Sequence, residues 1–286
     1  MTRVTHIDET VTIGGDLTVG RIGYGAMQLT GPKVWGEYPD HDQGVALLRE
    51  VVAAGVTFID TADAYGPHSN EELIREALHP YPDDVHLVTK IGFRRGDDRS
   101  WLPASSPDEL TAAVYDNLDH LGLDALDVVN LRVGDGTSSI ADRFGVLAAL
   151  REKGLIRHLG LSNVSATQLR EAQAIAPVVC VQNLYNVVER GDDALVDACA
   201  REGVGFTPFF PLGGFSPLQS GVLDDVAAQV GATPRQVALA WLLQRSPTML
   251  LIPGTSSVAH LRENLAAVDV VLPPAAVATL DRIAVS

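Results

Sequence analysis

The chain has 286 residues, of which 46% are hydrophobic and 20% charged, and its formal net charge at pH 7 is −15. This composition allows a large core, and the acidity argues against nucleic acid or an anionic membrane as a partner, because both would be repelled. The first residues, MTRVTHIDETVT, lack the apolar stretch of a secretory signal, and no run approaches the roughly 18 apolar residues of a membrane span. We therefore expect a cytoplasmic protein.

Cysteine and histidine usage bears on disulfides and metals. The two cysteines, Cys180 and Cys199, are too few for a disulfide framework or a cysteine zinc site. The eight histidines form neither an HExxH motif nor another closely spaced ligand pair. The sequence therefore predicts no metal, and it leaves a small molecule as the expected partner.

The first predicted element is a short β-hairpin over residues 11–19, where VTIGGDLTV alternates apolar and polar residues around Gly14–Gly15. Amphipathic segments typical of helices then separate eight β-rich runs, and several of these segments begin with a capping residue and end in glycine. SPDE (106–109) and TPRQ (233–236) have the form of a capping box with proline at the first helical position. The β-rich runs lie at 21–27, 56–60, 85–90, 126–133, 156–162, 178–183, 204–210 and 249–253.

This alternation of strands and helices predicts a parallel sheet. Closure into a (β/α)8 TIM barrel is the economical arrangement for this length, with an open doubly wound sheet as the alternative. The segment PPAAVATLDRIA near the C-terminus predicts an extra helix outside the barrel. No linker interrupts the pattern, so residues 1–286 are expected to form a single domain.

Three connections that follow strands are unusually long: 92–106, 133–139 and 210–221. In a barrel the carboxyl ends of the strands meet at one mouth, and long loops there build the functional site. GYGAMQ (23–28) lacks the third glycine of a dinucleotide-binding fingerprint and precedes no clear helix, so it is not read as one.

Three side chains at that mouth suggest a reaction. The second strand ends at Asp60, Tyr65 follows it, and the third strand ends at Lys90. Taken singly, each fits a salt bridge or a packed aromatic ring. Taken together, Asp60 would hold Lys90, and the lysine ammonium would stabilise the phenolate form of Tyr65, which makes this tyrosine a usable general acid near neutral pH. The reaction indicated is carbonyl reduction.

Several motifs in chain order resemble those of the aldo-keto reductases. They are FIDTADAYG (58–66), LVTKIG (87–92), GLSN (160–163), VQNLYN (181–186), FFPLGG (209–214) and IPGTSSVAHLREN (252–264). The resemblance implies that Tyr65 donates a proton, with Lys90 and Asp60 tuning it. It also implies a nicotinamide cofactor. The residues implied in binding the cofactor are Ser162, Asn163, Gln182, Phe209, Leu212, Gly213, Gly254, Thr255, Ser256, His260, Glu263 and Asn264.

Within this set, the resemblance assigns parts of the cofactor. Ser162, Asn163 and Gln182 would bind the carboxamide, which their amide and hydroxyl groups suit, and Phe209 would stack on the nicotinamide ring. Leu212 and Gly213 would follow the pyrophosphate through their backbone, and residues 254–264 would hold the adenosine end.

The cofactor is expected to be NADPH rather than NADH. Relatives commonly hold the 2′-phosphate with a lysine and an arginine, whereas this chain has Gly254 and His260 in the matching positions. Thr255, Ser256, backbone N–H groups at the helix start and a protonated His260 could replace them, with Arg262 as a further donor.

The fourth strand departs from the family. Asn130 and Arg132 lie on one face of LDVVNLRV (126–133), and Arg132 occupies the place where many relatives have a catalytic histidine. Arginine cannot exchange a proton at pH 7, so it would orient the carbonyl or stabilise negative charge on its oxygen. The alternative is that Arg132 pairs with Asp60 or Asp135. Asn130 is interpreted as a hydrogen-bonded core residue.

The substrate is expected to be an aldehyde or ketone. The motifs resemble most closely a bacterial subgroup that reduces pyridoxal to pyridoxine, and aromatic walls in the long loops would suit a flat heteroaromatic aldehyde. The candidate substrate-binding residues are Trp35, Phe93, Arg94 and Trp101, with Tyr38, Arg95 and Phe215 nearby.

Two other functions remain open. One is a nicotinamide-binding sensor or auxiliary subunit with little turnover, and the other is a lyase or isomerase that uses Lys90 as a Schiff-base nucleophile. The oligomeric state is open, with a monomer favoured.

Overall fold

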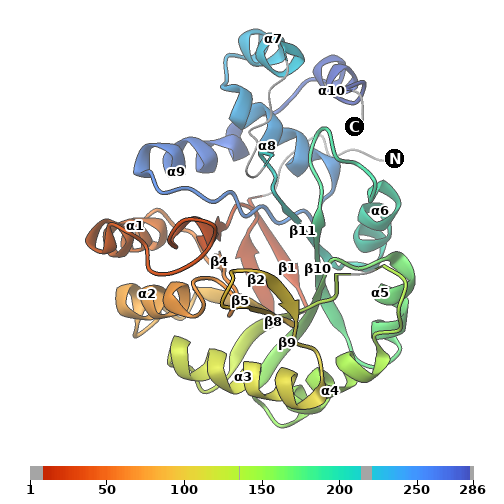
Figure 1. Ribbon diagram of the computed structural model, residues 1–286. Coiled ribbons are helices and arrows are strands. Elements are labelled where there is room, and N and C mark those ends of the chain that lie inside the picture. Colours follow the sequence, from red (N-terminus) through yellow and green to blue (C-terminus); the bar gives the residue numbers. More distant parts are fainter. Residues whose placement is uncertain (1–8, 135, 214–220, 284–286) are drawn as a thin grey trace.

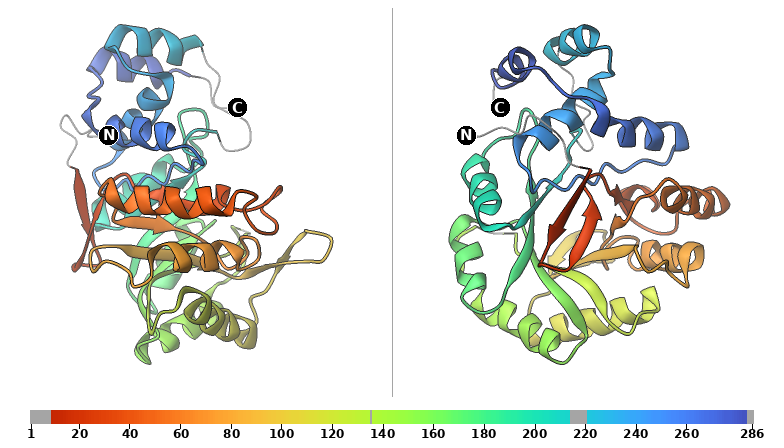
Figure 2. Two further views of the ribbon diagram at one scale, coloured as in Figure 1. Left: turned by 90° about the vertical axis from the view of Figure 1, so that its left-hand side faces the viewer. Right: turned by 180° about the vertical axis from the view of Figure 1, so that it is seen from behind.

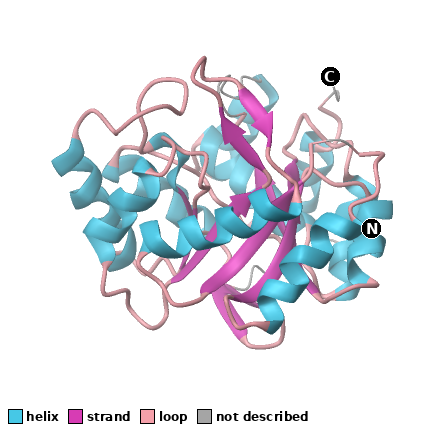
Figure 3. Ribbon diagram, turned by 60° about the horizontal axis from the view of Figure 1, so that its bottom comes forward, coloured by secondary structure: helices cyan, strands magenta, loops and turns pink. Residues whose placement is uncertain are grey.

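The computed structural model describes residues 9–134, 136–213 and 221–283. Its centre is a curled parallel sheet of seven strands, and the helices surround this sheet (Figure 1, Figure 3). In spatial order the strands are β3 (Tyr24–Gly25), β4 (Phe58–Asp60), β5 (His86–Ile91), β8 (Leu126–Arg132), β9 (Ile156–Ser162), β10 (Val178–Leu184) and β11 (Gly205–Phe209).

The eighth predicted run, 249–253, closes the barrel through isolated bridges and forms no regular strand. Met249 pairs with Phe206 of β11, and Leu251 pairs with Ile22 next to β3. Pro247 lies shortly before this run and Pro253 ends it, and proline cannot donate to a sheet ladder. The expected (β/α)8 barrel is therefore confirmed, with its last strand reduced to two isolated β-bridges.

Arg21 reinforces this seam. Its side chain is 1% exposed and donates to the carbonyl oxygens of Leu243 (2.7 Å), Ser246 (2.6 Å) and Met249 (3.2 Å). Hydrogen bonds from a charged donor are stronger than neutral ones. The guanidinium thus joins the segment that leads into β3 to the segment that completes the barrel.

The helices follow the strands in the predicted alternation. Both predicted capping boxes are present, at Ser106 with Glu109 and at Thr233 with Gln236. The predicted C-terminal helix is also present, as α10. The ten helices of the described residues are α1 (His41–Ala53), α2 (Ser69–Leu78), α3 (Pro107–Leu121), α4 (Ala141–Glu152), α5 (Ala166–Gln173), α6 (Asp193–Glu202), α7 (Gly221–Val230), α8 (Pro234–Arg245), α9 (Val258–Leu265) and α10 (Pro274–Leu280).

Two β-hairpins lie at opposite ends of the barrel (Figure 2). The predicted N-terminal hairpin is β1 (Thr10–Ile13) with β2 (Leu17–Gly20), and Gly14 and Gly15 supply the positive φ angles that its tight turn requires. The other pairs β6 (Phe93–Arg95) with β7 (Trp101–Pro103), in the long connection 92–106, where no strand was predicted. Antiparallel pairing of its two arms makes this connection a fixed wall at the mouth.

The N-terminal hairpin closes its end of the barrel with apolar side chains. Ile13 and Leu17 pack with Phe58, Val128 and Leu250 in one buried cluster. Within the described part of the chain, no helix is both long and apolar enough to cross a lipid bilayer.

Candidate active site

The proposed catalytic groups meet at the carboxyl ends of β4 and β5. Lys90 Nζ lies 2.6 Å from Asp60 Oδ1, donates to the carbonyl oxygen of Thr61 at 2.7 Å, and lies 5.1 Å from the centre of the Tyr65 ring. Asp60 uses its second oxygen, Oδ2, to accept from Gln182 Nε2 at 2.8 Å. The pairing of Lys90 with Asp60 expected from adjacent strand ends is therefore present, and Gln182 completes it.

Lys90 stays charged despite its burial. Both Lys90 and Asp60 are buried, and burial alone would disfavour the ammonium. The attraction of Asp60 and Tyr65 and the hydrogen bonds to them outweigh burial, so the pKa of Lys90 lies above its ordinary value. An ammonium is thus held beside the Tyr65 ring at neutral pH.

Asn70 fixes the loop that carries Tyr65. Its side chain is fully buried, donates to the carbonyl oxygens of Ala26 and Leu29 at 2.9 Å, and accepts from Thr61 Oγ1 at 2.7 Å. An asparagine with both ends of its amide bonded holds two segments in one register. The sequence did not single out Asn70, because a polar residue in the first turn of a helix is ordinary.

Arg132 ends β8 and is held by aromatic rings. Its guanidinium carbon lies 4.6 Å from the centre of the Trp101 ring and 5.2 Å from that of Phe93. The Trp101 ring also lies 4.4 Å from the guanidinium carbon of Arg95. Cation–π contacts of this kind contribute about 0.5–2 kcal/mol. The β6–β7 hairpin therefore helps to hold Arg132.

Asp60 and Asp135 were the two carboxylates expected as alternative partners of Arg132. Both carboxylate oxygens of Asp60 are engaged, one by Lys90 and one by Gln182. Asp135 lies outside the described residues. Asn130, two residues deeper in the barrel, accepts from Cys180 Sγ at 3.2 Å and is fully buried. This contact agrees with the interpretation of Asn130 as a core residue.

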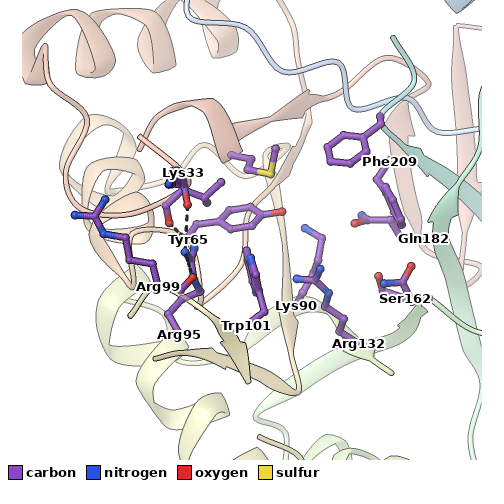
Figure 4. Close-up of a pocket in the computed structure, with 14 residues that line it drawn as sticks. Lys33, Tyr65, Lys90, Arg95, Arg99, Trp101, Arg132, Ser162, Gln182 and Phe209 are labelled. Carbon is purple, nitrogen blue, oxygen red and sulfur yellow. Dashed lines mark hydrogen bonds between the residues drawn. The ribbon is translucent and has the colours of Figure 1, made fainter. Parts of the chain in front are cut away.

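A cavity of about 380 Å³ opens above these groups (Figure 4). Eight of the proposed site residues line it, together with Arg95, which the sequence placed nearby, and five residues that the sequence did not single out. The eight are Tyr65, Lys90, Trp101, Arg132, Ser162, Asn163, Gln182 and Phe209; the five are Met27, Lys33, Val34, Arg99 and Phe210.

Three proposed substrate residues are not part of this lining. Trp35 lies beneath Arg95 and Arg99, Phe93 lies against Arg132, and Arg94 is exposed on the opposite face of its strand from Arg95. Phe215 lies outside the described residues.

Two further cavities continue from the first. One of about 300 Å³ shares Tyr65, Gln182 and Phe209 with it and reaches Leu212 and Gly254. The next, also about 300 Å³, begins at Leu212 and reaches Arg235 and Glu263 between α8 and α9. Together they form a path from the tyrosine to the region proposed for the adenosine end, and Arg235 is a cation on this path that the sequence did not indicate.

Buried polar groups without partners test whether this path fits a dinucleotide. Gln182 Oε1, at the end near Tyr65, has no hydrogen-bond partner among the described residues, and neither do Oδ1 and Nδ2 of Asn264, which is buried and follows the cavity-lining Glu263 in the chain. Such groups are costly unless a ligand or water pairs with them. A nicotinamide carboxamide and an adenine offer matching donors and acceptors, so the residues present fit the cofactor.

The remaining proposed phosphate-binding residues surround the start of α9. Thr255 is buried, and its carbonyl oxygen accepts from Tyr24 Oη at 2.6 Å. Ser256 is half-buried and His260 is exposed in the first helical turn. Arg262 points elsewhere, because its Nη2 pairs with Glu50 Oε1 at 2.7 Å. The loop is therefore fixed through Thr255 and leaves Ser256 and His260 accessible.

Backbone strain is concentrated around the first cavity, the one above Tyr65 and Lys90. Five of the six non-glycine residues with positive φ in the described chain line the first cavity: Lys33, Val34, Arg99, Asn163 and Phe210. The sixth, His68, follows the Tyr65 loop directly. Left-handed conformations of such residues cost roughly 1–3 kcal/mol each and cluster at functional sites.

The barrel and the Tyr65, Lys90 and Asp60 cluster at its mouth define a (β/α)8-barrel oxidoreductase. Residues 21–285 match the model of the aldo/keto reductase family. The chain is 60% identical to pyridoxine 4-dehydrogenase of Escherichia coli (strain K12) over 275 residues, which are 94% of this chain and 96% of that protein. The chain belongs to the aldo/keto reductase family.

Solved structures agree with this assignment. The fold matches a thermostable aldo-keto reductase in complex with the inhibitor epalrestat, with a TM-score of 0.84, 29% identity and coverage of 95% of this chain and 98% of that one. It also matches an aldo-keto reductase from Klebsiella pneumoniae in complex with NADPH, with a TM-score of 0.80, 27% identity and coverage of 99% and 95%.

Proposed function

We propose that this protein is an NADPH-dependent aldehyde reductase that converts pyridoxal to pyridoxine, with Tyr65 as the proton donor. The observation that carries the proposal is the position of Tyr65, which lines both the cavity shared with Arg132 and Trp101 and the one that leads towards Leu212. A phenol at such a junction can serve a substrate on one side and a cofactor on the other.

The proton transfer follows from the Lys90 ammonium. As the carbonyl oxygen gains negative charge, the Tyr65 hydroxyl donates its proton, and Lys90 stabilises the phenolate that remains. Asp60 holds the ammonium at 2.6 Å, and Gln182 holds the other oxygen of that carboxylate at 2.8 Å. These contacts fix the Lys90 ammonium beside the Tyr65 ring before substrate arrives.

Arg132 supplies a fixed positive charge in place of the histidine found in many relatives. Its guanidinium donates hydrogen bonds but cannot accept a proton at neutral pH. We assign it to orienting the carbonyl and stabilising its developing oxyanion. Trp101 and Phe93 contact this guanidinium through their rings, and such cation–π contacts do not require its N–H groups as hydrogen-bond donors.

The cofactor, when bound, supplies the hydride that reduces the carbonyl carbon. Ser162, Asn163 and Gln182 would hold its carboxamide, and Phe209 would face its ring. Leu212 and Gly213 would follow the pyrophosphate. Gly254, Thr255, Ser256 and His260 would surround the 2′-phosphate, with Glu263 and Asn264 at the adenine. NADPH is the proposed form because an aldo-keto reductase with a closely similar fold was solved with it.

Pyridoxal is the proposed substrate on two grounds. A 60% identical relative is named pyridoxine 4-dehydrogenase, and the exposed indole of Trp101 lines the cavity and could stack on a flat heteroaromatic ring. A cavity of about 380 Å³ is within the range of ordinary small-molecule sites. The cytoplasmic location and the monomeric state also remain proposals.

The test is NADPH oxidation with pyridoxal and a panel of aromatic aldehydes, measured for the parent, Tyr65→Phe and Tyr115→Phe. Removal of a general acid is expected to lower kcat at least about 100-fold for Tyr65→Phe. Tyr115 is 52% exposed on α3, so Tyr115→Phe should leave the rate unchanged.

Two other results would contradict the proposal. NADPH binding without oxidation by any aldehyde would indicate a sensor or auxiliary subunit. Trapping of a substrate on Lys90 by borohydride would indicate Schiff-base chemistry.

A further inference from the structure

We propose that the preferred substrate aldehyde carries an anionic group, a phosphate or a carboxylate, that Lys33 and Arg99 bind at the outer end of the cavity. This inference rests on the proposed function and names the substrate class of the same site. It concerns the part of the substrate that lies far from the reacting carbonyl.

The cavity lining is strongly cationic in an acidic protein. The chain carries a formal net charge of −15, yet five lysine and arginine residues and no aspartate or glutamate line this cavity. Two of the chain's three lysines, Lys33 and Lys90, are among them. A concave site lined by one sign of charge raises the local concentration of the opposite charge.

Three of these five cations already have defined roles. Lys90 is paired with Asp60. Arg95 is 8% exposed and donates to three backbone carbonyl oxygens, and Arg132 lies at the end of β8 with Trp101. Lys33 and Arg99 are exposed, and no carboxylate of a described residue forms an ion pair with either. They are the two charges left for a ligand.

Arg95 builds the site by holding these two residues together. Its Nη2 donates to the carbonyl oxygen of Lys33 at 3.2 Å and to that of Arg99 at 2.8 Å. Two oxygens bonded to one nitrogen lie no more than about 6 Å apart. Its Nη1 also donates to the carbonyl oxygen of Val34 at 2.7 Å. One buried guanidinium thus joins the loop of Lys33 to the β6–β7 hairpin that bears Arg99.

The backbone at both positions is strained. Lys33 has a φ of 64° and Arg99 a φ of 67°, although neither is a glycine. Such conformations persist where the surrounding structure imposes them, here through the hydrogen bonds of Arg95. Trp35 supports the cluster, because its ring lies 5.9 Å from the guanidinium carbon of Arg99.

The position of the cluster separates it from the proposed cofactor phosphates. Figure 4 shows Lys33, Arg95 and Arg99 on one side of Tyr65, and Ser162, Gln182 and Phe209 on the other. The path towards Leu212 and Gly254 begins on the second side. An anion bound by Lys33 and Arg99 would therefore belong to the substrate.

The carboxylate nearest in sequence to Arg99 is already engaged. Asp98 Oδ1 accepts from the backbone N–H of Ser100 at 3.0 Å and from its hydroxyl at 2.5 Å. These hydrogen bonds lower the pKa of Asp98 and keep it ionised. The Asp98 carboxylate therefore reduces the net positive charge near Arg99, but it forms no ion pair with this arginine.

The experiment compares neutral and anionic aldehydes of matched shape. The pairs are benzaldehyde with 4-carboxybenzaldehyde and pyridoxal with pyridoxal 5′-phosphate, which separate a carboxylate from a phosphate. The parent should prefer at least one anionic member, by about tenfold or more in kcat/KM, and added salt should weaken that preference. Equal kcat/KM for both members of each pair would overturn the inference and leave the reductase activity standing.

Substitutions assign the preference to residues. Lys33→Met and Arg99→Met should each reduce the ratio of anionic to neutral kcat/KM about 5- to 10-fold, through KM, because they remove one charge-assisted contact. Lys153→Met and Arg201→Met remove the same charges at exposed sites on other elements and should leave the ratio unchanged. A preference that survives in both Lys33→Met and Arg99→Met would also overturn the inference.

A binding measurement decides the inference without turnover. Calorimetry with pyridoxine 5′-phosphate and pyridoxine should show tighter binding of the phosphate ester by the parent, and a smaller difference in Arg99→Met. If no aldehyde is reduced but this difference is present, the proposed function fails and the anion site stands. Equal affinities for the two alcohols would count against the site.

Discussion

The two ends of the barrel differ in what their side chains do: one end is packed with apolar groups, and the other holds charged and polar groups around a cavity. At the end covered by β1 and β2, Ile13, Phe58 and Leu250 belong to an apolar cluster, and the chain there satisfies ordinary packing. At the mouth, cations face a cavity, the backbone is strained at Lys33 and Arg99, and polar atoms such as Gln182 Oε1 have no partner among the described residues. The comparison indicates that one end stabilises the fold, whereas the other maintains costly groups for binding and chemistry.

The largest expected effect of a single substitution in this comparison is at the closed end. Leu250→Ala removes a fully buried side chain from the cluster beneath the hairpin. The free energy of unfolding should fall by about 2–5 kcal/mol, from lost burial and the cavity left behind. Activity at temperatures where the variant is folded should change little, because Leu250 lines none of the cavities at the mouth.

Denaturant unfolding and kcat/KM on the same preparation check this separation. Ile175→Ala is the control, since Ile175 is 41% exposed and its truncation should have a small effect. A loss of activity in the folded Leu250→Ala protein, comparable to its loss of stability, would show that the two ends are coupled.

The second prediction exchanges a fixed charge at the mouth for a titrating one. Arg132→His should retain activity within about tenfold of the parent and acquire a pH dependence near the ordinary histidine pKa of about 6.5. The arginine itself cannot titrate in this range. Kinetics of the parent, Arg132→His and Arg132→Met across pH 5 to 9 would measure this.

The two Arg132 variants also separate a role of this charge in catalysis from a role in structure alone. If Arg132 acts on the carbonyl, Arg132→Met should lose more activity than Arg132→His at low pH, where the imidazole is charged. Identical pH profiles and rates in all three proteins would assign Arg132 to structure alone.

Much of the fold could be predicted because its signals are local or periodic. Capping boxes at Ser106 and Thr233 mark helix starts, and the alternation of strands with helices predicts parallel pairing. The same topology brings Asp60 and Lys90 together, since adjacent parallel strands end at the same mouth. The weak point was the last strand, because closure at Leu251 depends on contacts with Ile22, far away in the chain.

The rim of the site could not be predicted for the same physical reason. Lys33 and Arg99 are neighbours because Arg95 bonds to the backbone of both, across 62 and 4 residues of chain. No periodicity encodes such a bond. Arg94 and Arg95 look equivalent in the sequence, and only the hairpin β6–β7 separates them, burying Arg95 and leaving Arg94 exposed.

The smallest expected effect concerns the pH dependence of stability near the mouth. Glu71 is fully buried behind the Tyr65 loop, where Oε2 lies 3.0 Å from His68 Nδ1 and Oε1 has no partner among the described residues. Burial, with repulsion from Asp116 and Glu72, raises the pKa of Glu71 well above its ordinary value. Burial and repulsion from Glu71 likewise raise the pKa of Asp63.

The sign of the effect follows from proton linkage. Above the ordinary glutamate pKa of about 4.3, the unfolded chain loses the proton that the folded chain retains. The free energy of unfolding should therefore decrease as pH rises from about 4 through the raised pKa, by at most about 1.4 kcal/mol per pH unit for each such group.

Glu71→Gln removes one of these groups. The free energy of unfolding of this variant should therefore fall less steeply with pH than that of the parent, while Asp63 still contributes to the slope. Urea unfolding at several pH values above 4 measures the two slopes. Glu152→Gln, an exposed substitution on α4, should keep the parent's slope. If Glu71→Gln also keeps that slope, Glu71 is already ionised in the folded protein over this pH range, and the raised pKa is wrong.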